Sequence, residues 1–197
     1  KFISKQQLGH DYVVPPLEGL WWAEDMEAFT SARDKSQWDW TMMIMTPEWI
    51  TEEIFYDACE KARKGKNPIA LDMVRLERYH EGLSVQILHV GSYDQEGPTL
   101  IKLHQEFLPE NGFVENGKHH EIYLGDPRRV APEKLKTVLR QPVRDGLGHP
   151  GGRRVRRGGL ERPRVPPAAH RLLRGRAGTG RRRRRRRGAE HRGGGRR

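Results

Sequence analysis

The stretch HHEIYLGDP, residues 119–127, predicts a β-strand that ends in a turn. Because successive side chains on a strand point to opposite faces, Glu121 and Tyr123 share one face with His119, and His120 lies on the other. If the first face lines a pocket, Glu121 can act as a general base or meet a cation, and Tyr123 can donate or accept a hydrogen bond beside it. On the strand pattern alone, a solvated face with an ordinary carboxylate is the favoured interpretation.

The composition of the chain changes sharply near residue 144. Residues 145–197 carry 19 of the 37 basic residues, all of them Arg, and only three of the 26 acids, whereas residues 1–144 have a net charge of −5. All of the Trp, Tyr, Phe, Ile and Met lie before residue 145. A segment without these residues buries too little apolar surface to offset its chain entropy. We therefore expect one folded domain over 1–144 and a disordered tail over 145–197.

The tail allows two interpretations. Arg181 to Arg187 is an unbroken run of seven Arg, which suits an arm that binds nucleic acid non-specifically by counterion release. However, Arg without Lys, in the company of Gly, Pro and Ala, is also typical of a GC-rich gene read in the wrong frame. We favour the second interpretation, a non-native end of the chain.

The sequence shows no signal for secretion or for insertion into a membrane. No signal peptide is visible, and no apolar run approaches the length of a membrane span. The single Cys59 cannot form an internal disulfide, which fits a reducing compartment. We expect a cytoplasmic protein without membrane contact. The oligomeric state stays open. Because the chain begins at Lys1 rather than Met, we expect that its N-terminus is cut.

Hydrophobic spacing and turn residues predict strands and helices in alternating groups, and hence an α+β fold with a largely antiparallel sheet and helices on one face. Pro15-Pro16 suits an edge or a bulge, and Gly19 suggests a bulge or a close approach of backbone. The expected elements are an extended segment over 11–23, a strand over 38–46, a helix over 51–64, a hairpin of strands over 71–79 and 84–90, a helix around 100–108, a strand over 119–124, a helical turn at Pro132 and a last strand over 137–143.

Four segments carry a resemblance to a known family. They are Pro16 to Trp22, His89 to Tyr93, His120 to Leu124 and Leu139 to Val143, and they resemble the GyrI-like small-molecule-binding family in family order across residues 1–144. The resemblance implies a duplicated strand-helix-strand-strand unit, two copies of which form a concave antiparallel sheet with a ligand groove between them. It also implies that Lys1 to Gly9 is the stub of a helix, so that the first unit is incomplete.

A subgroup of this family with the same Trp-Trp and Glu-Ile-Tyr-Leu features is described as hydrolases of cyclopropane-bearing toxic compounds. The resemblance therefore implies a detoxifying hydrolase that opens the ring with water. Glu121 would be the general base and Tyr123 would hold the water or the substrate. Trp22 and Trp40 would enclose a flat ring system. The other expected contacts are Met42, Glu77 and Tyr79.

The main alternative is a protein that binds without turnover: a sensor or sequestering protein for flat, apolar or cationic molecules, in which Glu121 meets the cation. For any single Trp, an ordinary place in the hydrophobic core is about as good an interpretation. His89, His119 and His120 do not have the spacing of metal ligands, and no phosphate-binding Gly loop occurs. We expect no metal and no cofactor.

Overall fold

A computed structural model describes residues 1–24, 35–146 and 170–171. Residues 25–34 and nearly all of the tail lie outside these described residues. The strands are β1 (Leu17–Trp22), β2 (Asp39–Ile44), β3 (Arg78–Tyr79), β4 (Ser84–Val90), β5 (Phe113–Glu115), β6 (His119–Tyr123), β7 (Lys136–Asp145) and β8 (His170–Arg171). The helices are α1 (Phe2–Leu8), α3 (Glu52–Gly65), α4 (Gly97–Ile101), the π-helix η4 (Lys102–Phe107) and α5 (Leu108–Glu110), and short 3-10 turns are η1 (Lys35–Gln37), η2 (Leu71–Met73), η3 (Tyr93–Gln95) and η5 (Pro132–Lys134).

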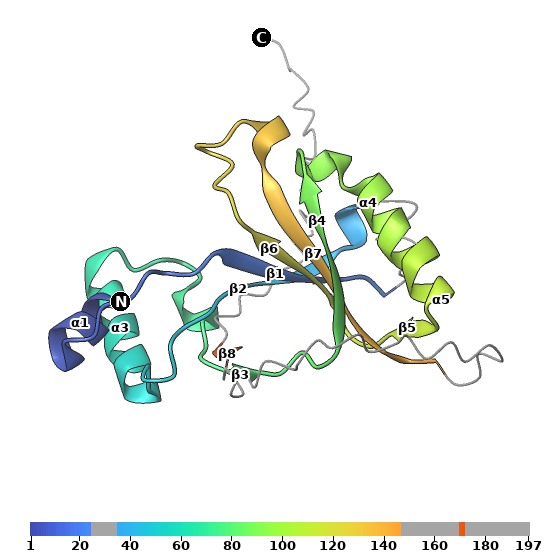
Figure 1. Ribbon diagram of the computed structural model, residues 1–197. Coiled ribbons are helices and arrows are strands. Elements are labelled where there is room, and N and C mark those ends of the chain that lie inside the picture. Colours follow the sequence, from blue (N-terminus) through green and yellow to red (C-terminus); the bar gives the residue numbers. More distant parts are fainter. Residues whose placement is uncertain (25–34, 147–169, 172–197) are drawn as a thin grey trace, which may run out of the picture.

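Five strands form an antiparallel sheet in the order β2-β1-β6-β7-β4, and β5 adds to the far end of β7. The hairpins β1–β2 and β6–β7 meet where β1 pairs with β6, and β4 pairs with β7 along its whole length. The continuous helical segment α4-η4-α5 runs beside β4 and β7, whereas α1 and α3 pack together beyond the end of β1 and β2 (Figure 1). The predicted α+β fold with an antiparallel sheet is confirmed.

The sheet has a hydrophobic cluster on each face. On the face that α4 covers, Leu100 packs against Leu139, with Trp21, Trp38 and Ile87 around them. On the opposite face, Leu20 and Met43 form a second cluster with Trp22 and Tyr79. Because both faces of the central strands are covered, residues of either face can hold buried polar groups.

One predicted hairpin is wrong. Residues 71–79 do not form a strand that returns along 84–90: residues 71–73 are a 3-10 turn, and β3 is only two residues long and pairs with β8. β4 instead pairs with β7, whose residues Thr137, Leu139 and Gln141 are buried and whose register buries one face of both strands. A turn at Glu81-Gly82 favours a local hairpin in the sequence, but the pairing of a strand depends on its packing against distant partners, here β7.

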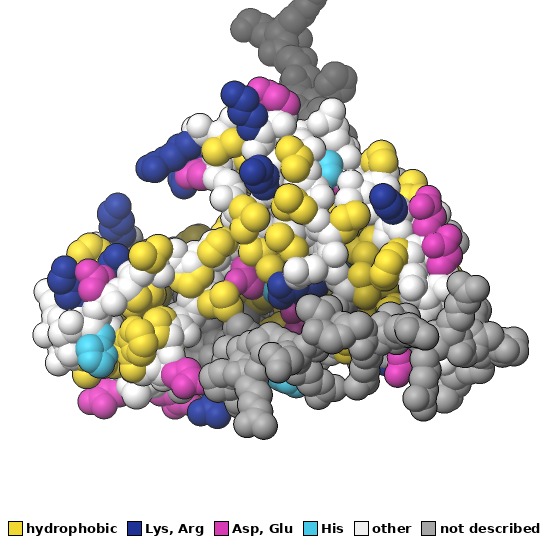
Figure 2. Space-filling view, viewed as in Figure 1, with side chains coloured by type: hydrophobic (Ala, Val, Ile, Leu, Met, Phe, Trp, Pro, Cys, Tyr) yellow, Lys and Arg dark blue, Asp and Glu magenta, His cyan; other side chains and the backbone are white. Residues whose placement is uncertain are grey.

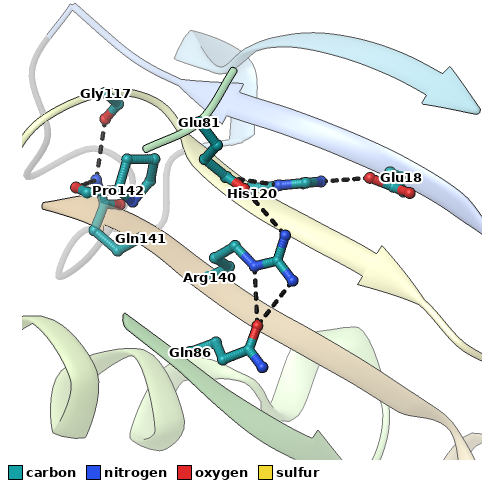
Figure 3. A network of polar contacts seen from close by, with 8 residues as sticks. All are labelled: Glu18, Glu81, Gln86, Gly117, His120, Arg140, Gln141 and Pro142. Atoms are coloured by element: carbon teal, nitrogen blue, oxygen red, sulfur yellow. Dashed lines mark hydrogen bonds and ion pairs between the residues drawn. The ribbon is translucent and has the colours of Figure 1, made fainter. Parts of the chain in front are cut away.

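A polar network crosses the sheet on the face opposite the α4 helix (Figure 3). The His120 ring lies between two carboxylates: Nε2 is 2.9 Å from Glu18 Oε2, and Nδ1 is 2.8 Å from Glu81 Oε1. Arg140 donates from Nη1 to Glu81 Oε2 at 3.0 Å and also to Gln86. The network therefore ties β1 to β6, to β7 and to the turn before β4.

The charges in this network support one another. Burial alone would lower the pKa of His120, but the hydrogen bonds to Glu18 and Glu81 outweigh it and raise the pKa. Burial acts to raise the pKa of Glu81, but His120 and Arg140 outweigh it and lower the pKa. An imidazolium between two carboxylates is thus the stable state. Its contribution to the free energy of unfolding is largest at pH values between the pKa of Glu and the pKa of His in the unfolded chain.

We predict that His120→Gln lowers the free energy of unfolding by about 3 kcal/mol near pH 6, because it leaves the buried Glu18 without a cation and Glu81 with Arg140 alone. The raised pKa means that this stabilisation is fully present below the unfolded pKa of His and is lost as pH rises through the folded pKa. Urea unfolding of both proteins from pH 5 to pH 9 should therefore show a difference that shrinks with rising pH. His80→Gln, on an exposed ring, is the control. A difference that does not change with pH would contradict this account.

Candidate functional site

A cavity of about 1190 Å³ opens on the same face of the sheet as α4, next to the β1–β6 junction. Its walls come from the segment before β1, from β1, β2 and β6, from the η3 turn and from the loop after β6. The lining residues are Val13, Val14, Pro15, Pro16, Leu17, Trp21, Trp38, Trp40, Met42, Tyr93, Glu96, Glu121, Tyr123, Leu124, Gly125, Asp126, Pro127 and Arg128. Figure 2 shows hydrophobic side chains gathered over the middle of one face of the molecule, whose outline is notched between the α1–α3 part and the β6–β7 loop.

A chain of hydrogen bonds leads to the one carboxylate of β6. Trp21 Nε1 donates to the Tyr123 hydroxyl at 2.9 Å, and the hydroxyl donates to Glu121 Oε2 at 2.7 Å. Glu121 is only 6 % exposed. The phenol therefore holds the carboxylate in one orientation from the cavity wall, and the indole holds the phenol.

The register of the sheet brings these groups together. β1 lies between β2 and β6, with Trp21 opposite Trp40 and Gly19 opposite both Met42 and Glu121. A Cβ on Gly19 would lie 2.8 Å from Trp21 Nε1 and 3.0 Å from the Tyr123 hydroxyl. The sequence suggested a bulge or a close approach of backbone at Gly19, but the atoms that lie close to this residue belong to side chains, those of the Trp21–Tyr123 hydrogen bond and of Met42.

Both tyrosines of the cavity stay protonated over the ordinary pH range. Burial raises the pKa of Tyr123 strongly, and the charge and hydrogen bond of Glu121 raise it further. Burial also raises the pKa of Tyr93, with smaller contributions from the charges of Glu96, Glu121 and Asp126. The two rings lie edge to face, with centroids 5.6 Å apart. The hydroxyl of Tyr123 is therefore a lasting donor to Glu121.

The remaining charges of the cavity lie in two places. Glu96 is 3 % exposed and sits just before α4, on the same cavity wall as Tyr93. Asp126 and Arg128 form an ion pair at the rim, with Nη2 2.8 Å from Oδ2, and the hydrogen bonds from Arg128 hold the pKa of Asp126 at about 2. The rim is therefore close to neutral, whereas the interior carries carboxylates within an aromatic wall.

Four of the seven residues expected at a site line this cavity: Glu121, Tyr123, Trp40 and Met42. The other three lie elsewhere. Trp22 follows Trp21 on β1 and so points to the opposite face, where Lys118 Nζ lies 3.0 Å from the centre of its ring. Tyr79 packs edge to face against His120, also on the opposite face, and Glu77 pairs with Arg75.

The pairing of Trp22 with Trp40 is therefore corrected to Trp21 with Trp40. Alternation along β1 required that one of the two adjacent Trp face the cavity, but only the register with β2 shows which one it is. Glu77 and Tyr79 were placed near the site because a strand over 71–79 was expected beside β4, and that strand does not form.

Several wall residues are not among the seven expected site residues, although the alternation of the strand over 38–46 places Trp38 on the same face as Trp40 and Met42. Trp38 precedes β2 and packs edge to face on Trp21, with ring centroids 5.9 Å apart. Tyr93 and Glu96 belong to the turn between β4 and α4, where Ser92 and Gln95 form a capping box. The S-x-x-Q pattern predicts that cap in the sequence, but nothing local shows that the turn borders a cavity whose other walls come from distant parts of the chain.

The described ranges, 1–24, 35–146 and 170–171, hold no group of three or more His, Cys, Asp or Glu side chains arranged to bind a metal ion. Within the same ranges, no helix has the length and apolar character needed to cross a membrane.

Comparison with known proteins gives one family and several solved structures. A family model described as "GyrI-like small molecule binding domain" matches residues 43–144. An uncharacterised conserved protein from Listeria innocua is 42 % identical over 72 % of each chain, with a TM-score of 0.64. Two structures described as hydrolases from Listeria innocua are 39 % and 38 % identical, each over 72 % of this chain and 72 % and 73 % of its own length, with TM-scores of 0.58 and 0.60. No curated protein matches the chain.

We predict that Gly19→Ala disrupts the Trp21–Tyr123 hydrogen bond, because the added methyl group occupies the space through which it passes. The expected loss of stability is about 1–3 kcal/mol, typical of overpacking, and ligands of the cavity should bind more weakly. Thermal unfolding and near-ultraviolet circular dichroism of the Trp bands would measure both effects. Gly65→Ala, in helix α3 with open space around the new methyl group, is the control: it should leave the Trp bands and ligand binding unchanged and should not lower stability.

Proposed function

The chain belongs to the GyrI-like small molecule binding domain family, and on that premise we propose that it binds flat, largely apolar molecules and hydrolyses those that carry an electrophilic cyclopropane. The proposed role is detoxification. The observation that carries the proposal is the hydrogen-bonded series Trp21–Tyr123–Glu121, which holds a buried carboxylate on the wall of an aromatic cavity.

The composition of the cavity supports a flat ligand. Trp21, Trp38 and Trp40 line it together with Met42 and Tyr93. Aromatic rings and thioethers offer large polarisable contact areas to a planar ring system, and few polar groups compete with them. A molecule of drug size fits the volume of the cavity.

The carboxylate supports a reaction with water. A cyclopropane conjugated to a carbonyl is opened when a water oxygen bonds to a ring carbon, a carbon–carbon bond breaks and its electron pair moves to the carbonyl oxygen. Glu121 would accept the proton of the attacking water through Oε1, because Oε2 already accepts from Tyr123. Tyr123 holds the carboxylate, and the surrounding rings exclude bulk water, which strengthens every electrostatic contact.

The comparisons support the same reaction class more weakly. Two of the similar structures are described as hydrolases at 39 % and 38 % identity. Their description names no substrate, so the cyclopropane rests on the resemblance of the Trp-Trp and Glu-Ile-Tyr-Leu segments and on the chemistry of the cavity.

The second candidate is a protein that binds without turnover. The observation in its favour is that Glu96 and Glu121 place two buried carboxylates in an aromatic wall, which suits an organic cation. The same cavity serves both functions. Turnover separates them, because a cation receptor needs no water against Glu121.

We predict that Glu121→Gln abolishes hydrolysis but not binding. For a carbonyl-conjugated cyclopropane, kcat should fall by about 10²–10⁴-fold, the usual contribution of a general base. Product formation by liquid chromatography and binding by Trp fluorescence quenching would be measured side by side. If the wild type binds the compound without forming product, the protein is a receptor and the assignment of Glu121 as a base is wrong.

We predict that Trp21→Phe and Trp22→Phe differ. Trp21→Phe removes the donor to Tyr123, a hydrogen bond worth about 1 kcal/mol, so kcat/KM should fall by about fivefold. Trp22→Phe is the matched control, since that ring lies on the opposite face of β1. Equal effects of the two changes would contradict the assignment of Trp21 to the cavity.

A further inference from the structure

Behind Glu121, a row of three titratable side chains leads away from the cavity. His119 Nε2 is 3.8 Å from Glu121 Oε1, the oxygen that does not accept from Tyr123. The His119 ring lies against the His104 ring, with centroids 5.4 Å apart. His104 Nδ1 is 2.6 Å from Glu115 Oε1. These contacts link the cavity to β5 in three steps.

Burial decreases along the row from the cavity wall to the surface. His119 is fully buried, the His104 side chain is 3 % exposed and the Glu115 side chain is 36 % exposed. Glu115 can therefore exchange protons with solvent, whereas the two histidines can do so only through their neighbours or through local opening of the fold. Burying a pair of His rings costs free energy wherever a ring nitrogen makes no hydrogen bond.

The helix that covers the sheet is irregular at this point. His104 belongs to η4, a π-helical stretch between α4 and α5. π-Helical turns are rare, and they occur frequently at functional sites. Here the wider turn carries the His104 ring between β6 and Glu115 of β5, and Nε2 of that ring makes no hydrogen bond with the described residues. This nitrogen is therefore available to exchange a proton.

The protonation state of His119 suits a carrier. Burial lowers the pKa of His119 well below its usual value, and the charges of His104 and His120 lower it further, while a hydrogen bond with Gln141 acts in the opposite direction. A ring that stays neutral can accept a proton from a neighbour but does not retain it. The His119 ring beside Glu121 Oε1 is therefore uncharged in the resting protein.

We propose that His119, His104 and Glu115 form a proton path that connects the carboxyl group of Glu121 with the protein surface. The proposal rests on the proposed function for its use in catalysis. When substrate fills the cavity, the open side of Glu121 is blocked, and this path lets the carboxyl group return to its basic form.

The protons of the reaction balance along this path. Glu121 takes one proton from water as the carbon–oxygen bond forms, and the electron pair of the broken carbon–carbon bond moves to the substrate's carbonyl oxygen. The proton on Glu121 passes to His119, then to His104 and Glu115, and leaves to solvent. The product oxygen takes one proton from solvent, so that the overall reaction consumes only water.

The first test needs no turnover. In full-length protein labelled with ¹⁵N-His, NMR measures the exchange of the His119 ring N–H with water in a Glu121→Gln background, where the cavity end of the path is closed. Adding His104→Gln or Glu115→Gln should slow this exchange by about tenfold or more, because the remaining route then requires local opening of the fold. Adding His89→Gln should change nothing, since this buried ring instead contacts Thr99 and the Ser92 carbonyl.

The second test uses steady-state turnover. Glu115→Gln, at the surface, should keep KM but lower kcat in dilute buffer by about tenfold, less than the 10²–10⁴-fold effect of removing the base itself, because Glu115 only passes the proton on. Added imidazole should restore kcat by taking the proton from His104, and the solvent isotope effect on kcat should rise. Glu110→Gln, an exposed carboxylate at the end of α5, is the matched control and should behave as the wild type.

The outcomes separate the two proposals. If the wild type shows no turnover, the proposed hydrolysis fails, but the NMR exchange still decides whether the path exists. If His119 exchange is the same with and without His104 or Glu115, the proton path is wrong even when Glu121→Gln abolishes hydrolysis. Because Glu115 lies at the surface, its variant keeps the test valid should His104→Gln fail to fold.

Discussion

The antiparallel pairing of β1 with β6 is the interaction on which the rest of this structure depends. It joins the two hairpins into one sheet, and its register sets Gly19 opposite Glu121 and Leu20 opposite His120. One face of the pair then carries the aromatic cavity, and the other carries the Glu18–His120–Glu81 network. A shift of the register by one residue would exchange the two faces and destroy both.

Buried carboxylates have different partners on the two faces of the sheet. On the network face, Glu18 and Glu81 are neutralised by the imidazolium of His120 and the guanidinium of Arg140, and this closed arrangement is suited to stability. On the cavity face, Glu121 receives a neutral donor, Tyr123, and has a neutral ring, His119, at its back. Burying a carboxylate is costly to stability, and titratable groups in such surroundings are frequent at functional sites.

Much of the architecture was predictable from local patterns. The helix over α3 has its Thr51 cap and apolar spacing in the sequence, and the alternation of β6 correctly assigned Glu121 and Tyr123 to one face. The strand over 71–79 was predicted wrongly because its alternation matches β-structure but its proposed partner, β4, finds a longer partner in β7. The choice of partner depends on long-range burial, which no local window contains.

The sequence by itself determined which residues alternate, where turns and caps occur, and that a carboxylate and a phenol share one face of β6. Only the tertiary structure decided that Trp21 rather than Trp22 faces Glu121, and that the Trp21–Tyr123 hydrogen bond occupies the space where a side chain on Gly19 would lie. It also decided that His119, His104 and Glu115 form a row. The physical reason is that periodicity assigns a side chain to a face of its own element. Which other element covers that face is set by strand register and packing between segments that lie far apart in the chain.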